Sequence, residues 1–337
     1  MKQQERQDSR RSIGTLRVVV AALMVVSLAS TTRPADAQTV LIQEGFEDAS
    51  FTSRGWYDGG GSVLSTVERY TGTRSLECRF AIGATSCPSP ARRLFTATDA
   101  VYLSFYIKHS ANWVGSGKTY HPHMFMFLTN LDGNYIGPAY THLTTYIEEN
   151  GGVPLFAIQD GMNIDESRVG QDLTAVTEQR SVAGCNGDSD GSGNGDCYNA
   201  TPTVHWNGKQ WRAGGAYFDN MPGSATYKGD WHLVEVYFKL NGIAGGKGVK
   251  DGIIRYWYDG NLIIDRSSVV MRTGANPTMK FNQFFIGPWI GDGSPADQAY
   301  WVDDLVIATA RPATPPMPPT SPSTSLPAAP TNLRIIP

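Results

Sequence analysis

The stretch Trp231-His-Leu-Val-Glu-Val-Tyr-Phe-Lys-Leu240 alternates between apolar residues and residues that carry polar or phenolic groups. Successive side chains of a β-strand point to opposite faces of its sheet, so this spacing predicts a strand with one core face and one polar face. The polar set consists of Glu235, Tyr237 and Lys239.

Three later segments continue the pattern: Gly252-Ile-Ile-Arg-Tyr-Trp-Tyr-Asp259, Met279-Lys-Phe-Asn-Gln-Phe-Phe-Ile286 and Tyr300-Trp-Val-Asp-Asp-Leu-Val-Ile-Ala308. We predict that they are strands too. In the first of them, Arg255 and Trp257 alternate with apolar and aromatic neighbours, and we expect them to extend the polar face. A face that combines a carboxylate, cations, a phenol and an indole is too polar for a core and is typical of a sugar-binding surface.

Residues 1–37 predict a secretory signal peptide. Basic residues precede an apolar run of 13 residues, Val18–Ser30, and Ala35-Asp-Ala37 supplies the small residues of a cleavage site. The run is shorter than the roughly 20 residues that a membrane-spanning helix needs. Ser9-Arg-Arg-Ser-Ile13 leaves a twin-arginine export route open beside the general secretory route. We expect a mature protein that begins near Gln38 and is secreted or periplasmic.

The remaining chain divides into two parts. Short aromatic and β-branched runs, separated by Gly, Asn and Asp turns, fill residues 38–310. They predict one all-β domain, a sandwich of two antiparallel sheets, and we expect it to be a monomer. Residues 311–337 are dense in Pro, Ser, Thr and Ala, which predicts a disordered tail. Between residues 160 and 229 the strand pattern breaks down, as is usual for functional loops.

The charge balance limits the classes of partner. Residues 1–37 hold six of the 28 basic and three of the 31 acidic residues, so the mature chain has a net charge of −6. This argues against nucleic-acid binding, which needs a basic surface. An anionic polysaccharide stays compatible with it, because a few cations gathered in a cleft suffice.

The four cysteines fit an exported protein with disulfides. Three pairings are open. We favour Cys78–Cys87 and Cys185–Cys197, because each closes a short loop rich in Gly, Ser, Pro or Asp, and no Cys-x-x-Cys spacing favours zinc.

Several segments together resemble the concanavalin A-like jelly rolls, which include laminin-G-like domains, polysaccharide lyases and glucanases. They are Glu44-Gly-Phe-Glu-Asp48, Thr73-Arg-Ser-Leu76, the hairpin from Trp231 to Tyr258, and Trp301-Val-Asp-Asp-Leu-Val-Ile307. The resemblance covers residues 41–309. It implies two packed antiparallel sheets, one of them curved into a groove for a glycan chain.

The resemblance also suggests a chemistry. Tyr237-Phe-Lys239 resembles the Tyr-Phe-Lys of jelly-roll alginate lyases, although Leu240-Asn-Gly follows in place of the Gly and second Tyr of that motif. A lyase removes the proton α to a uronate carboxylate, which needs a base, an acid and a cation. We expect Tyr237 and His123 to transfer protons and Lys239 and Arg255 to neutralise the carboxylate.

Other residues are candidates for glycan contacts. His121 and His123 lie two positions apart, so they share a side of an extended segment, and we prefer His123 as the cleft residue and His121 as a neighbour that binds sugar. Metal ligation by this pair would need a third ligand that is not evident nearby. We add Glu235, Trp257 and Trp113 as substrate-binding residues, because sugar rings stack on flat aromatic faces.

Two further residue patterns bear on function. Glu148 and Glu149 are adjacent and must point to opposite faces, so they do not form the carboxylate pair of a glycosidase, and hydrolysis ranks below lysis. Oxygen donors at alternate positions predict a structural calcium site, formed by Asp188, Asp190, Ser192, Asn194 and Asp196. The leading hypothesis is a secreted lyase of an acidic polysaccharide. The alternative is a non-catalytic carbohydrate-binding or adhesion module on the same fold.

Overall fold

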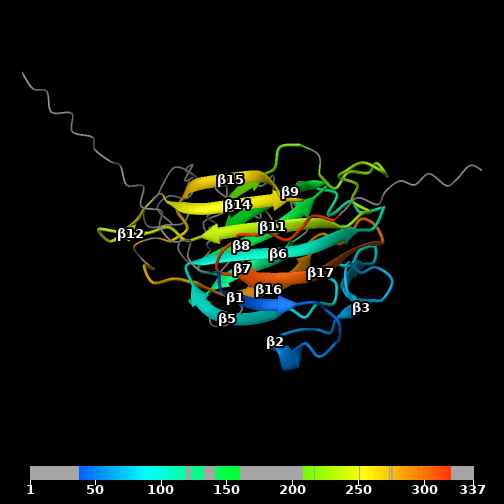
Figure 1. The fold of residues 1–337 in the computed structure, drawn as a ribbon, viewed down its shortest axis with the longest axis horizontal. Coiled ribbons are helices and arrows are strands. Elements are labelled where there is room, and N and C mark those ends of the chain that lie inside the picture. The colour runs from blue at the N-terminus through cyan, green and yellow to red at the C-terminus, as the bar shows by residue number, and fades with distance from the viewer. Residues whose placement is uncertain are drawn as a thin grey trace, which may run out of the picture. The chain divides into compact units, whose positions relative to one another are not determined.

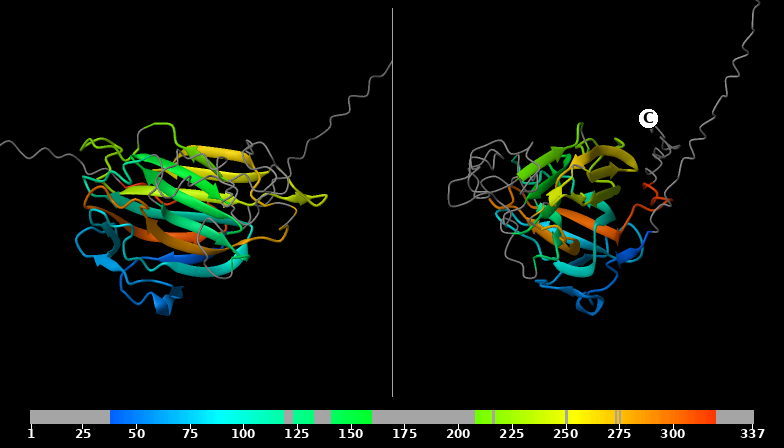
Figure 2. Two further views of the ribbon diagram at one scale, coloured as in Figure 1. Left: turned by 180° about the vertical axis from the view of Figure 1, so that it is seen from behind. Right: turned by 90° about the vertical axis from the view of Figure 1, so that its left-hand side faces the viewer.

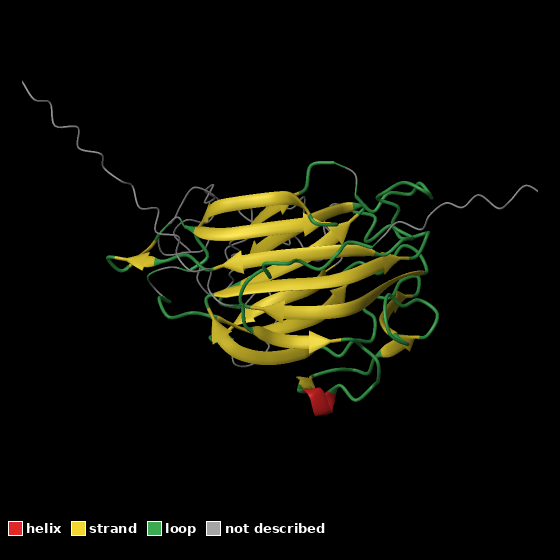
Figure 3. Ribbon diagram, in the orientation of Figure 1, coloured by secondary structure: helices red, strands yellow, loops and turns green. Residues whose placement is uncertain are grey.

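The computed structural model describes residues 38–319, except 119–122, 133–140, 160–207, 216, 250, 273 and 275. Nearly all regular structure in this part is β-strand (Figure 3), with a single 3₁₀ turn, η1, at Thr52–Arg54. No helix in the described ranges is long and apolar enough to cross a membrane. The predicted all-β sandwich is confirmed.

Two antiparallel sheets form the sandwich (Figures 1 and 2). Sheet A consists of β1 (Val40–Glu44), β3 (Val63–Ser65), β4 (Ser75–Phe80), β6 (Ala100–His109), β11 (His232–Lys239), β14 (Gly252–Tyr258), β15 (Asn261–Val269) and β17 (Gln298–Ala308). Sheet B consists of β2 (Trp56–Tyr57), β5 (Arg92–Thr98), β7 (His123–Thr129), β8 (Thr144–Asn150), β9 (Val153–Gln159), β10 (Gly208–Arg212) and β16 (Phe281–Trp289). A separate ribbon pairs β12 (Ile243–Ala244) with β13 (Lys247–Gly248).

The four strands predicted from the C-terminal third all exist, but they do not form one sheet. β11, β14 and β17 belong to sheet A, whereas β16 crosses to sheet B. The structure also contains β15, which the sequence reading missed because this edge strand is polar along much of its length. β14 and β15 are joined by Asp259-Gly260, whose φ angles of 46° and 77° suit a tight hairpin turn.

The core lies between the two sheets and is built from the apolar side of each strand. Val234, Val236 and Phe238 of β11 are at most 1% exposed and pack in this core. On sheet B, Phe125 and Phe127 of β7 do the same. The apolar half of the alternation therefore assigned the core face of β11 correctly.

A second, smaller apolar cluster lies on the outer face of sheet B, the face turned away from sheet A. It consists of Met126, Leu128, Tyr146, Leu155 and Ala157, with Phe285 packed against it. These residues follow each other across β16, β7, β8 and β9. Sheet B thus has apolar side chains on both faces, which is why its strands lack a clear polar period.

Candidate functional site

The predicted polar face exists on the outer side of sheet A. Tyr237 is paired with Arg255 across β11 and β14, and Glu235 is paired with Trp257, so these four share one face. Lys239 follows on β11 and is exposed. The alternation in the sequence identified this face because its period depends only on the strand geometry.

This face is crossed by the chain itself, as the red segment in front of β6 and β11 in Figure 1 shows. Arg311 donates two hydrogen bonds of 2.8 Å to the carboxylate of Glu235, and its guanidinium lies 4.6 Å from the centre of the Trp257 ring. The Tyr106 hydroxyl donates to the carbonyl of Met317 at 2.7 Å. The sequence predicts a disordered tail from residue 311, whereas the described part of it, residues 311–319, contacts sheet A.

The crossing segment changes the interpretation of two predicted substrate-binding residues. Glu235 is 0% exposed and also accepts a hydrogen bond from the Tyr102 hydroxyl at 2.7 Å. Trp257 is 8% exposed beneath Arg311. Both side chains have internal partners, which gives them a structural role in this conformation. Arg255 is bound to Asp265 at 3.0 Å, on the edge strand β15.

His123 lies on the other sheet, at the first position of β7. Its Nδ1 atom is hydrogen bonded to Glu148 of β8, and its ring centre lies 4.6 Å from that of Tyr146. Glu148 and Tyr146 alternate along β8 on its outer side. The structure therefore does not bring His123 together with Tyr237, Lys239 and Arg255, because the hydrophobic core separates the outer faces of the two sheets. The expected four-residue site is not formed.

The side chains of His123 and Glu148 form a polar pair that is buried beside apolar residues of sheet B. The side chains are 5% and 3% exposed. A carboxylate that accepts a hydrogen bond from Nδ1 fixes the tautomer of a neutral histidine and leaves Nε2 as the basic nitrogen. It also stabilises the imidazolium that forms when Nε2 takes a proton. This arrangement is suited to a general base.

Two arginines lie on the same face of sheet B, on either side of this pair. Arg92 of β5 is paired with Phe285, and its guanidinium lies 5.6 Å from the Tyr57 ring and 5.9 Å from the Phe285 ring. Arg212 of β10 is exposed. It is paired with Leu155 of β9, which is in turn paired with Glu148 of β8, so the three residues form one row across the sheet. Arg92 is 3% exposed and is ion-paired with Asp58, so of these two cations Arg212 is the one that is exposed on the face of the His123–Glu148 pair.

The residues of this second face were not selected from the sequence, apart from His123. Tyr146 and Glu148 are two positions apart on one strand and therefore share a face. This spacing is visible in Thr144-Thr-Tyr-Ile-Glu148. What the sequence could not indicate is that this strand is the neighbour of the one that begins at His123. Arg92 and Arg212 come from strands distant in the sequence, and nothing in their local context marks them.

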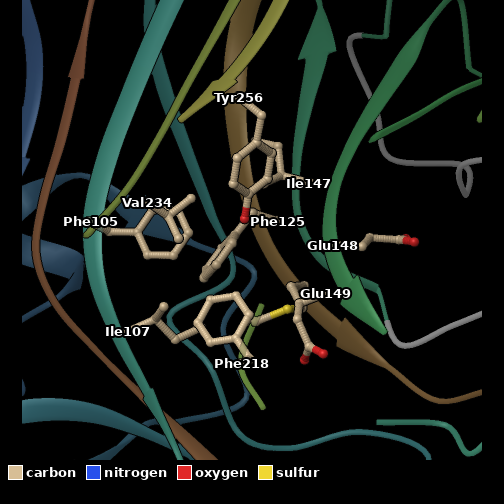
Figure 4. Close-up of a pocket in the computed structure, with 10 residues that line it drawn as sticks. Phe105, Ile107, Phe125, Ile147, Glu148, Glu149, Phe218, Val234 and Tyr256 are labelled. Carbon is tan, nitrogen blue, oxygen red and sulfur yellow. The ribbon is translucent and has the colours of Figure 1, made fainter. Parts of the chain in front are cut away.

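Glu149 points the other way, into the core (Figure 4). It accepts hydrogen bonds from Trp113 Nε1 at 2.6 Å and from the amide of Gly152, and it lies 3.4 Å from His109 Nε2. Burial raises the pKa of Glu149 to about 7 and lowers the pKa of His109 well below its usual value. Trp113, predicted from the sequence to contact a glycan, is 3% exposed, and its indole donates a hydrogen bond to Glu149.

A cavity of about 10 Å³ lies between the sheets near this carboxylate. Figure 4 shows Phe105, Phe125 and Tyr256 around it, while the Glu148 side chain points away. Its size approaches the room of one water molecule and is far below that of a sugar ring. This cavity therefore cannot hold a sugar ring.

Some expectations fall outside the described residues. They concern His121, Asp188, Asp190, Ser192, Asn194, Asp196, Cys185 and Cys197. In the ranges that the structure does describe, no group of three or more His, Cys, Asp or Glu side chains is arranged to hold a metal ion. The disulfide Cys78–Cys87 is present, which confirms one of the two favoured pairings.

Comparison with known proteins identifies the fold. No family model and no curated protein matches the sequence. Among solved structures, alginate lyase vAL-1 from Chlorella virus is similar, with a TM-score of 0.50, 12% identity, and coverage of 81% of this chain and 100% of that chain. An endo-β-1,4-glucuronan lyase from the fungus Trichoderma reesei gives a TM-score of 0.44 and 14% identity over 81% of this chain and 96% of that one. The first likeness supports a jelly-roll fold like that of a polysaccharide lyase.

Proposed function

We propose that this protein cleaves an acidic polysaccharide by β-elimination on the outer face of sheet B. The observation that carries the proposal is the His123–Glu148 pair, with Tyr146 against the histidine ring and arginines on the same face. The shared fold with an alginate lyase adds support for a polysaccharide as the substrate class. The features of residues 1–37 support action outside the cytoplasm.

The proposed step assigns one role to each group. His123 Nε2 takes the proton from C5 of a uronate, the C4–O4 bond breaks, and a C4=C5 double bond forms. The leaving oxygen receives a proton from the Tyr146 hydroxyl, and Glu148 holds the imidazolium. Arg212 neutralises the uronate carboxylate, which lowers the energy of the carbanion that develops at C5.

The proposal requires that a glycan reach this face. His123, Glu148 and Tyr146 are each at most 4% exposed, so this face has to open transiently in the free protein before a glycan can reach them. Protection of His123 from diethyl pyrocarbonate by the substrate measures this access directly. Labelling that is absent with and without glycan would argue against the site.

The deciding experiment is an activity screen. The mature chain is incubated with alginate, glucuronan, pectate and glycosaminoglycans, and the ultraviolet absorbance of unsaturated uronates is recorded. We expect one acidic glycan to give product and His123→Ala to abolish it, while Tyr237→Phe and Lys239→Ala on sheet A retain it. Activity that survives in His123→Ala but is lost in Tyr237→Phe and Lys239→Ala would mean that the site is on sheet A. Glycan binding without product on any substrate would favour the non-catalytic module.

A further inference from the structure

Trp289 is the last residue of β16 and stands apart from the other tryptophans. Its side chain is 44% exposed, which makes it the most accessible of the seven tryptophans that the structure describes. Five of the others are at most 8% exposed and serve the core or internal hydrogen bonds. Single exposed apolar residues are common on protein surfaces, and what sets Trp289 apart is that it lies directly opposite His123 in the sheet.

The ring belongs to the same face of sheet B as His123. Trp289 is the direct partner of His123 across the β16–β7 ladder. A Cβ placed at Gly287 would come within 2.5 Å of the side chains of Met126 and Phe285, so position 287 faces the outer cluster. The register shifts between Ile286 and Trp289, so the direction of the Trp289 side chain follows from its pairing with His123, because directly paired residues share a face of the sheet.

The backbone around Trp289 is held on both sides. Pro288 before it is buried, and the amide of Ile290 after it donates a 2.8 Å hydrogen bond to the carbonyl of Thr85. Lys118 forms an ion pair of 2.5 Å with Asp292, which ties the segment before β7 to the segment after β16. A ring on a fixed backbone loses little conformational freedom when a ligand stacks on it.

We propose that the indole of Trp289 stacks on the pyranose ring of a uronate residue bound next to His123. The inference rests on the proposed function, because it takes His123 as the base that acts on the neighbouring sugar. A pyranose ring has an apolar face of C–H groups. This face can pack against the indole because an aromatic side chain offers a large, flat apolar surface. Lys118 at the same end of the sheet is paired with Asp292, so the pair adds no net charge there. The acidic character of the sugar follows from the proposed function.

Binding is measured separately from catalysis. The inactive His123→Ala protein is titrated with oligomannuronate, oligoguluronate, oligoglucuronate and oligogalacturonate, and tryptophan fluorescence is recorded. We expect one of them to change the emission, and Trp289→Ala in the same background to weaken binding about tenfold and to remove most of that change. Trp289→Phe keeps a smaller ring and should weaken binding less.

The controls separate this inference from the lyase proposal. Trp231→Phe, immediately before β11 of sheet A, should leave both the affinity and most of the emission change intact. Unaltered melting temperatures in the Trp289 variants show that the fold is kept. Oligouronate binding that depends on Trp289, without product from the wild-type chain, would refute the lyase and keep the stacking site. Product release with an unchanged KM in Trp289→Ala, or no oligouronate binding by the chain, would overturn the stacking site.

Discussion

Glu148 and Glu149 are neighbours on β8, and each lies against a histidine on a different side of sheet B. Glu148 bonds to His123 on the outer face, whereas Glu149 lies 3.4 Å from His109 inside the sandwich. Figure 4 shows the two side chains pointing in different directions. One strand therefore links the proposed site to a titratable group in the core.

Glu148 can be tested as a positioning residue. In Glu148→Gln the carboxylate that stabilises the imidazolium of His123 is lost, and we expect kcat to fall about 100-fold. Glu148→Asp keeps the carboxylate and should recover part of the rate. Equal loss in both variants would mean that Glu148 serves packing alone.

Arg212 and Arg255 provide a matched pair on opposite sheets. Arg212 follows the row of Glu148 on sheet B, and Arg255 is bound to Asp265 on sheet A. If Arg212 neutralises the uronate, Arg212→Ala should lower kcat/KM by about 10²-fold, the usual cost of losing one group that stabilises a developing negative charge. Arg255→Ala should keep kcat/KM within about twofold of the wild type. An inverted result would support the sheet A face.

Arg311 should contribute to stability through Glu235. Glu235 is fully buried, and Arg311→Ala leaves its carboxylate without its cation, which costs about 3 kcal/mol in the free energy of unfolding. Urea denaturation measures this loss. Adding Glu235→Gln should recover part of it, since the uncompensated charge disappears. Arg255→Ala breaks an exposed pair and should cost about 0.5 kcal/mol or less.

Glu149 should make stability depend on pH. Its pKa rises from 4.5 to about 7 through burial, so the stability that it contributes is complete below pH 4.5 and is lost as the pH rises through 7. The loss is on the order of 3 kcal/mol. The lowered pKa of His109 acts in the opposite sense, because the stability from its neutral form is lost as the pH falls below 6.5.

The difference between wild type and Glu149→Gln isolates this contribution. Glutamine keeps an oxygen for the Trp113 indole but does not titrate, so the stability gap between the two proteins should change between pH 4.5 and 7 and be constant above it. Urea midpoints at a series of pH values measure the gap. A gap that is independent of pH would show that Glu149 does not titrate in this range.

The Cys78–Cys87 disulfide closes a loop of nine residues in sequence separation. In the chain-entropy account, closing so short a loop stabilises the fold by about 2–3 kcal/mol. We expect the double variant Cys78→Ala/Cys87→Ala to lose about that much free energy of unfolding while still cleaving glycan, because both cysteines pack in the core and not on the outer face of sheet B. Loss of activity with normal stability would contradict this view.

The sequence by itself determined the strand faces. The period of two in Trp231–Leu240 separated Val236 and Phe238, which are buried, from Tyr237 and Lys239 on the outer side, because side-chain direction follows from local backbone geometry. The same rule placed Glu148 and Glu149 on opposite sides of β8. The pairing Cys78–Cys87 was also within reach, since a short loop brings its two ends together.

Only the tertiary structure decided which faces meet. β16 joins sheet B although its neighbours in sequence, β15 and β17, belong to sheet A, and Trp289 consequently lies beside His123, far from it in sequence. Residues 311–319 cover part of the polar face that the sequence favoured for a glycan, because Arg311 lies over Glu235 and Trp257. The first outcome depends on long-range strand pairing, and the second depends on burial of the Arg311–Glu235 pair. Neither can be detected in the local alternation of residues.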